Sequence, residues 1–161
     1  MKKIILSLFL MLSVYMVKAQ NASVDKVTSA YIGVKNALVG SNATLAKSQS
    51  KDLLDALSGL KGLTPAQQKT ANTYLDKLKF DSRHISQTTK IDHQREHFQS
   101  LSNNMYSMLS ALKLNGTTLY QQYCPMKKAA WLSESEDIRN PYYGNEMLDC
   151  GTVKATLAAA K

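Results

Sequence analysis

Apolar residues recur at helical spacing through most of this chain, and this periodicity constrains the fold more than any other feature. One face of an α-helix repeats every three to four residues, so each periodic run predicts an amphipathic helix. The four runs contain Val24, Val27, Tyr31, Val34 and Leu38; Leu45, Leu53, Leu54 and Leu57; Ala71, Tyr74, Leu75, Leu78 and Ile85; and Ile91, Phe98, Leu101, Met105, Leu109 and Leu112. The pattern therefore predicts four helices that share one core.

The breaks between these runs are short and carry signals for the starts and ends of helices. Gly40 ends the first run and Gly59 ends the second. Thr64–Gln67 predicts the start of the third helix, with a threonine cap, a proline at the first helical position and a glutamine two residues later. Asn115-Gly116 ends the fourth helix, which is expected over about Ile91–Leu114. Short connections favour an up-down four-helix bundle, so we expect a mainly α fold.

Residues 1–19 have the pattern of a secretory signal peptide. Lys2-Lys3 precedes the apolar run Ile4–Val17. Val17 and Ala19 then supply the small residues at −3 and −1 of a predicted cleavage before Gln20. The run is too short to predict a membrane span, and no second candidate follows it. We therefore expect export to the periplasm and a mature chain of residues 20–161 that forms one helical domain without a membrane span.

The charge balance argues against a nucleic-acid partner. The chain carries 20 Lys and Arg against 12 Asp and Glu, for a net charge of +8. Three of the lysines lie in the predicted signal peptide, so its removal lowers the net charge from +8 to +5. The remaining basic residues are spread along the chain, without the basic run and interleaved aromatic residues that a nucleic-acid surface needs.

After Gly116 the helical periodicity is lost, and residues 120–151 concentrate soft sulfur ligands. Both cysteines, the only tryptophan and two methionines lie there: Cys124, Met126, Trp131, Met147 and Cys150. Proline, glycine, tyrosine and asparagine cluster in the same stretch, which predicts an irregular segment. The tail of residues 153–160 is expected to form a short last helix.

The spacing of the sulfur atoms is compatible with a soft-metal site. Proline favours extended backbone before it, which would turn Cys124 and Met126 to the same side. Met147 and Cys150 are three residues apart, so a helical turn would also place them on one side. Thiolate and thioether ligands together select Cu(I). Trp131 would then cover the ion as an aromatic lid with a cation–π contribution.

A disulfide between Cys124 and Cys150 is the alternative for the same residues. Export places both cysteines in an oxidising compartment, where a disulfide is the default expectation. Closing a loop of this length would stabilise the fold by about 3–4 kcal/mol in the chain-entropy model. Spacing alone favours the disulfide over a metal site. A third arrangement combines the two, with a disulfide in the oxidised protein and a copper site in the reduced protein.

The histidines match no complete catalytic motif. His93 and His97 fit the pattern H-x-x-E-H of inverted zinc proteases, but such an enzyme needs a further ligand and a substrate cleft. We therefore interpret the pair as a solvated helix face, and His84 has no evident partner. His97 lies about 12 Å along the helix from Met105, so the two cannot bind one ion. Without a phosphate loop or a nucleophile elbow, we expect no enzymatic activity.

Several strings of residues resemble a known bacterial family. R-x-H-F-x-x-L-S-x-x-M spans Arg95–Met105, and Y-C-P-M and W-L-S follow at Tyr123–Met126 and Trp131–Ser133. The strings continue through Ile138–Gly144 and Met147–Gly151. Over residues 95–151 the chain resembles an exported family catalogued as domain of unknown function, family thirty-three forty-seven. Related modules occur with periplasmic adaptors of heavy-metal efflux pumps for copper and silver.

The resemblance implies a role in metal handling in the cell envelope. The candidate ligands that it supports are Cys124, Met126, Met147 and Cys150, together with His97 and Met105. We therefore predict a non-enzymatic periplasmic domain that binds Cu(I) or Ag(I) in metal handling or efflux. Its expected partner is a periplasmic efflux or delivery protein. The alternative is a structural or protein-interaction module that is stapled by the disulfide and binds no metal.

Overall fold

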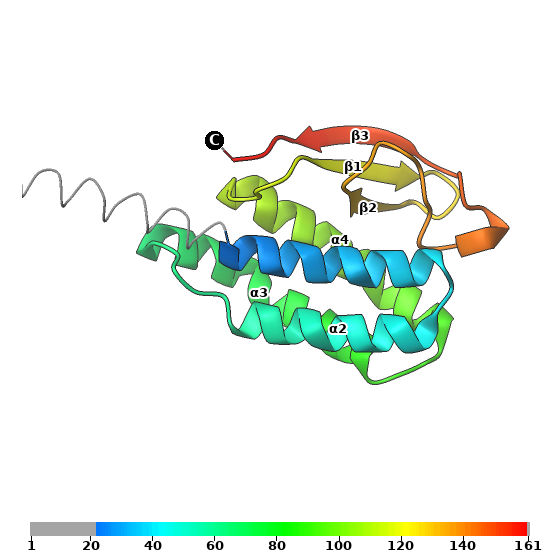
Figure 1. The fold of residues 1–161 in the computed structure, drawn as a ribbon, viewed down its shortest axis with the longest axis horizontal. Helices are drawn as coiled ribbons and strands as arrows, with labels where there is room; N and C mark the ends of the chain where they lie inside the picture. Colours follow the sequence, from blue (N-terminus) through cyan, green and yellow to red (C-terminus); the bar gives the residue numbers. More distant parts are fainter. Residues whose placement is uncertain (1–21, 161) are drawn as a thin grey trace, which may run out of the picture.

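The computed structural model describes residues 22–160 and shows four helices followed by a small β-sheet (Figure 1). The first helix covers residues 22–39 of the described part, and three more follow: α2 (Ala43–Ser58), α3 (Pro65–Ser86) and α4 (Ile91–Leu112). The expected mainly α fold is therefore confirmed. The predicted signal peptide lies outside the described residues. Within them, no helix combines the length and apolar character that crossing a membrane requires.

The helix ends are set by the capping residues in the sequence. The Thr64 side chain accepts a hydrogen bond from the backbone N–H of Gln67, whose own side chain accepts one from the Thr64 N–H, and this confirms the predicted capping box. Asn42 caps α2 in a similar way by accepting from the N–H of Leu45. Helix α4 ends slightly earlier than expected because Lys113 adopts a left-handed conformation with a φ of 53°.

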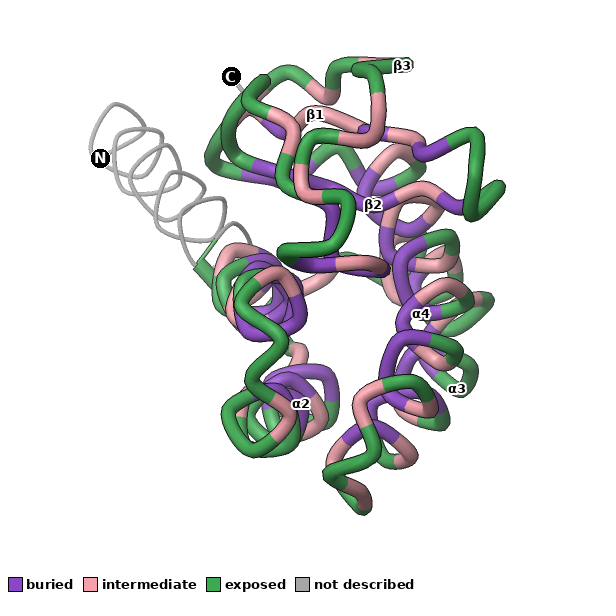
Figure 2. Tube along the Cα trace, turned by 90° about the vertical axis from the view of Figure 1, so that its right-hand side faces the viewer, coloured by how far each residue is buried: buried purple, intermediate pink, exposed green. Residues whose placement is uncertain are grey.

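The four helices bury the apolar positions that the periodicity marks. Helix α3 packs on α2 and on α4, and the buried residues face the interior between the helices (Figure 2). The Tyr31 ring of the first helix stacks on Phe98 of α4, with 5.5 Å between the ring centroids. Of the predicted core positions, Leu45 is an exception because it is 45% exposed at the start of α2.

The segment after α4 is irregular only in part, over residues 134–151, because the rest of it forms a three-stranded antiparallel sheet. The strands are β1 (Leu119–Cys124), β2 (Ala129–Ser133) and β3 (Thr152–Leu157), in the order β2-β1-β3. A tight turn over residues 125–128 joins β1 to β2. A longer excursion with a short 3-10 helix, η1 (Gly144–Glu146), leads to β3. The cysteines therefore lie at strand ends, Cys124 in β1 and Cys150 just before β3.

The prediction of a short last helix over residues 153–160 is wrong. Alanine favours helix, and this tail is rich in alanine, but its first half pairs with β1, with Tyr123 opposite Thr152 and Tyr120 opposite Thr156. Val153 and the two threonines are β-branched and suit an extended strand. The pairing partners lie 29 to 38 residues earlier in the chain, so local propensity gives no sign of them.

The sheet lies along one side of the helices and contacts α4 through β2. A buried tyrosine makes a second connection, because the backbone N–H of Leu132 in β2 donates to the Tyr31 hydroxyl over 3.0 Å. That hydroxyl also lies 2.8 Å from the Ser102 hydroxyl of α4. Burial raises the pKa of Tyr31 despite these two hydrogen bonds, so the group stays neutral and joins the sheet to two helices.

Arg95 of α4 provides the main polar link between the helices and the excursion before β3. Its Nε donates to the carbonyl of Pro141 over 3.0 Å, and its Nη2 donates to the Ser41 hydroxyl over 2.9 Å and the Leu38 carbonyl over 3.4 Å. Burial lowers the pKa of Arg95 from its ordinary value. One guanidinium thus holds together three segments that lie far apart in the sequence.

Candidate metal centre

Three histidines converge at one end of the helical part. His84 of α3 and His93 and His97 of α4 each offer a ring nitrogen, and these nitrogens all lie within 4.8 Å of one another. The ring centroids of His84 and His97 are 4.5 Å apart, and those of His93 and His97 are 4.7 Å apart. All three side chains are partly exposed. The cluster therefore combines close ligand atoms with access from solvent.

The α3–α4 hairpin brings these residues together. Helix α3 ends at Ser86 and α4 begins at Ile91, so the two helices run antiparallel from a short turn. His84 and His93 lie at nearly equal distances along the chain from this turn and therefore at the same level of the hairpin. Asp81 and His97 form the next level, about one helical turn further from the loop. The site consequently has one layer near the loop, with His84 and His93, and a second layer with Asp81 and His97.

Gln94 holds the turn in place. Its side-chain nitrogen lies 2.8 Å from the Thr88 carbonyl in the loop and 2.9 Å from the Ala43 carbonyl at the start of α2. The Ile85 carbonyl of α3 is also within reach, at 3.4 Å. Gln94 is fully buried, and it follows His93 directly in the chain. The backbone that carries the histidines is thereby fixed on three sides.

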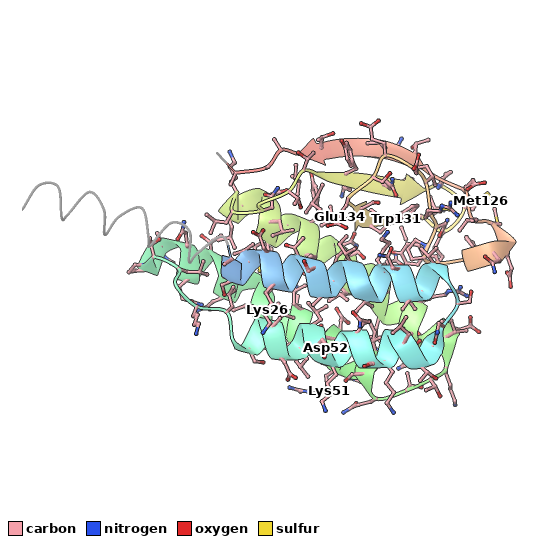
Figure 3. The ribbon with its side chains drawn as sticks, in the orientation of Figure 1. Lys26, Lys51, Asp52, Met126, Trp131 and Glu134 are labelled. Atoms are coloured by element: carbon pink, nitrogen blue, oxygen red, sulfur yellow. The ribbon has the colours of Figure 1, made fainter. Side chains whose placement is uncertain are left out.

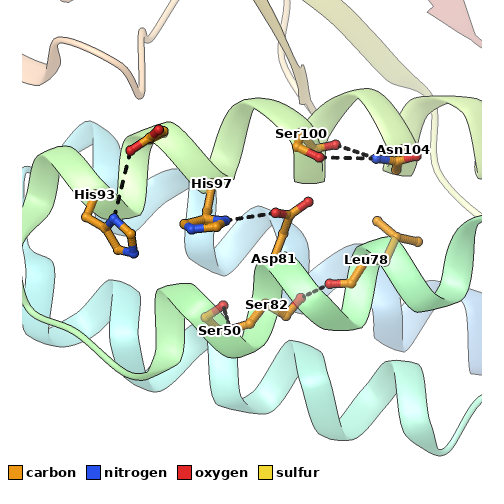
Figure 4. Close-up of polar contacts among 9 residues, drawn as sticks. Ser50, Leu78, Asp81, Ser82, His93, His97, Ser100 and Asn104 are labelled. Carbon is orange, nitrogen blue, oxygen red and sulfur yellow. Dashed lines mark hydrogen bonds and ion pairs between the residues drawn. The ribbon is translucent and has the colours of Figure 1, made fainter.

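Asp81 orients His97 (Figure 4). The His97 Nδ1 lies 2.9 Å from the Asp81 Oδ1, and the Asp81 side chain is 4% exposed. A carboxylate only accepts hydrogen bonds, so the His97 Nδ1 carries the proton and its Nε2 keeps the lone pair when the ring is neutral. Metal-bound histidines typically make this hydrogen bond to a carboxylate, which fixes the ring and raises its basicity. The second oxygen of Asp81 is buried without a hydrogen-bond partner.

The dimensions of the cluster suit a transition-metal ion after small side-chain rotations. Nitrogens bound to one tetrahedral ion lie about 3.3 Å apart, given metal–nitrogen distances of about 2.05 Å. The nitrogens here spread over at most 4.8 Å, so turning the imidazole rings closes the difference. Phe80 lies against this group, with its centroid 4.3 Å from the His84 ring, and is 52% exposed. It covers one side of the cluster with an apolar surface.

The two cysteines form a second constellation in the sheet. The Cys124 Sγ and the Cys150 Sγ are 2.9 Å apart and both are free thiols. Burial by itself raises the pKa of Cys124, but hydrogen bonds from Cys150, from the Lys127 and Met126 backbone and from the Asn140 side chain lower it overall. The hydrogen bond to Cys124 raises the pKa of Cys150. Of the two thiols, Cys124 therefore loses its proton more readily than Cys150.

The remaining candidates from the sequence are spread over different environments. Met126 is 68% exposed in the turn at the outer end of the sheet (Figure 3). Met147 is 37% exposed after η1. Trp131 is buried in β2, where its ring lies T-shaped to Tyr142 with 6.0 Å between centroids. Met105 is fully buried in the helical core. His97 belongs to the histidine cluster rather than to the cysteine segment.

Sequence reasoning recognised His93 and His97 as neighbours on a helix but missed the contribution of α3. His84 has no motif around it, and Asp81 has none either. The signal was the symmetry of the hairpin: residues at equal distances from a short helix–helix turn lie side by side. Pairing residues across the turn at 87–90 matches His84 with His93 and brings Asp81 to within one position of His97.

The comparison with known protein families includes the histidines and leaves out the cysteines. No curated protein and no solved structure matches the chain. A family described as "Protein of unknown function (DUF3347)" matches residues 27–117, which is more than half of the chain. The match includes all the residues of the histidine cluster and ends before β1. The chain therefore belongs to the DUF3347 family of proteins of unknown function.

Proposed function

We propose that this chain is a non-enzymatic, exported metal-binding domain and that His84, His93 and His97 form its principal site. The observation that carries the proposal is the convergence of three imidazoles whose ligand atoms lie within 4.8 Å of one another. The buried Asp81 carboxylate beside His97 supports it, because it supplies the outer hydrogen bond that metal-binding histidines use. The periplasm is the proposed location.

Imidazole ligands point to copper as the ion. Neutral imidazole suits zinc, copper, iron and nickel, and copper(II) binds most tightly among the divalent first-row ions. Three protein ligands leave at least one coordination position open, unlike the closed sites that have a purely structural role. An open, partly exposed site can accept an ion from one protein and release it to another. We therefore propose metal handling, with a periplasmic efflux or delivery protein as partner.

Calorimetric titration of the metal-free chain tests this function. The protein is made without a polyhistidine tag and titrated separately with Cu²⁺ and Zn²⁺ at neutral pH. We expect one equivalent of Cu²⁺ to bind more tightly than Zn²⁺. Replacing His93 and His97 together by alanine should weaken binding by more than about 100-fold, since loss of an outer-shell partner alone costs 10–100-fold.

Asn104→Ala is the matched control. Asn104 is a partly exposed residue of α4 that lies about two turns beyond His97. This variant should bind copper like the parent protein, and circular dichroism should confirm that all variants keep their helices. The proposal fails if the parent chain binds neither ion, or if the double histidine variant binds as well as the control.

The pH dependence of binding provides an independent measurement. Imidazole binds a metal ion only in its neutral form, so protons compete with the ion. The affinity for Cu²⁺ should fall as the pH is lowered from about 7.5 to about 5.5, the range in which histidines commonly titrate. Affinity that does not change over this interval would exclude histidine ligands.

A soft-metal site at Cys124 and Cys150 is the second candidate, and the adjacency of the two sulfur atoms favours it. In this arrangement Cu(I) or Ag(I) would bind the two thiolates, and Met126 and Met147 would turn inward from their exposed positions. Two sulfurs bound to one tetrahedral ion lie about 3.7 Å apart, given metal–sulfur distances of about 2.3 Å. The thiols are 2.9 Å apart and would have to separate.

Variants distinguish the two sites. The reduced chain is titrated with Cu(I) against a competing chelator, with His93→Ala/His97→Ala and Cys124→Ser/Cys150→Ser measured in parallel. A soft-metal site in the sheet predicts loss of Cu(I) only in the serine variant and weakened binding in Met126→Leu and Met147→Leu. Methionine-to-leucine changes conserve volume, so they should leave the stability almost unchanged.

For the fold, we propose the up-down order of a four-helix bundle. The short connections between successive helices support it, since they allow neighbouring helices to pack antiparallel. The order is also consistent with the contacts of α3 with α2 and α4.

A further inference from the structure

Cys124 and Cys150 meet at the end of the β1–β3 ladder. Tyr123 and Thr152 form the terminal pair of this ladder, Cys124 is the next residue after Tyr123, and Cys150 lies two residues before Thr152. The sulfur atoms are 2.9 Å apart. The backbone thus presents the two side chains to each other.

Surrounding residues hold the second cysteine in this position. The Asn140 side chain donates to the Cys150 carbonyl over 2.8 Å and accepts from the Tyr142 N–H over 2.8 Å. Gly151 allows the close approach of Trp131, because a Cβ at this position would lie 2.9 Å from the indole ring. Asn140 and Trp131 are both buried. The proximity of the thiols is therefore built by the chain around them.

We infer that Cys124 and Cys150 form a reversible dithiol–disulfide site that reacts by exchange with small-molecule or protein disulfides. This inference is independent of the histidine site and needs no metal. It assigns a redox reaction to a pair that the family match does not include.

The reaction proceeds in two displacements. Cys150 is partly exposed and Cys124 is fully buried, so an external disulfide meets Cys150 first. The Cys150 thiolate attacks one sulfur of that disulfide, forms a mixed disulfide and releases a thiolate. Cys124 then attacks the Cys150 sulfur, closes the internal disulfide and releases the second thiolate. The two protons of the cysteines pass to the leaving groups, so two thiols are oxidised and one external disulfide is reduced.

The protonation of the pair suits these roles. Hydrogen bonds lower the pKa of Cys124, which favours the thiolate that the second displacement needs. The hydrogen bond to Cys124 raises the pKa of Cys150, which reduces the thiolate fraction available for the first displacement. Because the Cys124 sulfur already touches Cys150, the mixed disulfide should be short-lived.

The state of this pair would determine two properties of the protein. A closed disulfide links the end of β1 to the start of β3 and encloses β2, the excursion and η1 in one covalent loop. It also removes both thiolates, so the oxidised chain cannot bind a soft ion there. The histidine cluster is unaffected, because it lies in the helical part.

Exchange with glutathione tests the inference. The metal-free, reduced chain is incubated with excess oxidised glutathione, unreacted thiols are alkylated, and intact masses are measured. We expect a monomer that has lost two hydrogens and carries neither glutathione nor an alkyl group, and dithiothreitol should restore both thiols. Two alkylated cysteines, glutathione on both cysteines, or dimers linked by disulfides would each overturn the inference.

Single variants test the order of the two displacements. Cys124→Ser should accumulate the mixed disulfide of Cys150 with glutathione, because the second attack is missing. Cys150→Ser should react more slowly, since its remaining thiol is buried. Faster reaction of Cys150→Ser than of Cys124→Ser would overturn the assignment of Cys150 as the entry point.

Thermal unfolding tests whether the disulfide stabilises the fold. Oxidation should raise the melting temperature of the parent chain by about 10 °C, as expected for a closed loop of this length. The Cys124→Ser/Cys150→Ser variant, with its fold checked by circular dichroism, should show no shift with oxidant. If the disulfide of the parent chain closes without any change in melting temperature, the disulfide does not stabilise the fold.

Discussion

The helical part of the chain and the sheet that follows it are held together by different kinds of contact. Residues 22–112 pack through apolar side chains at helical spacing, and their helix ends are capped locally. The sheet and its excursion rely more on buried polar side chains that bind distant backbone groups. Gln122 donates to the carbonyls of Ser135, Glu136 and Asp137, and Tyr142 donates to that of Ala130.

The two parts therefore differ in how the sequence specifies them and in which candidate ligands they position. The helical part is specified by a pattern that repeats along the sequence, and it places imidazoles on rigid helices. The sheet is specified by single residues that each hold a loop, and it places two thiols at the end of a strand ladder. Removing single contacts, either between the two parts or within one of them, tests this difference.

Arg95→Ala should have the largest effect. The change leaves the carbonyls of Pro141 and Leu38 and the Ser41 hydroxyl without their donor. Hydrogen bonds from a charged group each contribute about 1.5–3 kcal/mol, so we expect the free energy of unfolding in urea to fall by about 3 kcal/mol or more. Exposed Arg83→Ala is the control and should stay within about 0.5 kcal/mol. Equal effects of the two changes would show that Arg95 is not the link between the two parts.

Asp81→Asn tests the outer layer of the histidine site. The substitution keeps the shape of the side chain but removes the charge that holds the proton on the His97 Nδ1. Affinity for Cu²⁺ should fall by about 10–100-fold, as is typical for such outer-shell partners. Asp76→Asn changes an exposed residue of the same helix and should leave the affinity unchanged in the same calorimetric titration. Similar affinities for the two variants would reduce the His97–Asp81 pair to a packing contact.

Tyr31→Phe tests the second connection between the two parts. Removing the hydroxyl leaves the backbone N–H of Leu132 and the Ser102 hydroxyl without this buried partner. We expect a loss of about 1–2 kcal/mol in the free energy of unfolding. The partly exposed Tyr74→Phe of α3 is the matched control. If the sheet folds independently of the first helix, Tyr31→Phe will cost no more than this control.

Thr64→Ala should have the smallest effect and remain local to the helical part. It removes the side chain that caps α3 and should cost about 1 kcal/mol. Hydrogen exchange should become faster in the first turn of α3 and stay unchanged in the sheet. Thr73→Ala, at an exposed position inside the same helix, should be neutral or slightly stabilising because alanine favours helix. Faster exchange in the sheet would show that the two parts unfold together.

The sequence predicts the helical part well because its determinants are local. Periodicity located four helices, and the Thr64–Gln67 motif located the start of α3. The strands were missed because each is short and is stabilised by pairing with a distant partner. The tail is rich in alanine, which favours helix, whereas its pairing with β1 determines its conformation.

The two candidate sites differ in the same way. The cysteines could be recognised as a possible pair from their residue type, and they lie side by side. Whether they bind a soft ion or close a disulfide stays a prediction. The histidine cluster required knowledge of the α3–α4 hairpin, because His84 and Asp81 acquire meaning only beside His93 and His97.

Gln94 also bears on how selective the histidine cluster would be. Its buried amide anchors the α3–α4 turn to α2, so the backbone beneath the three imidazoles has little freedom to adjust. Only ring rotations remain to be frozen when an ion binds, which keeps the entropic cost of binding low. An ion that requires a wider or differently angled ligand set would have to deform this anchored hairpin. Such a preorganised site discriminates between ions by coordination geometry as well as by intrinsic affinity.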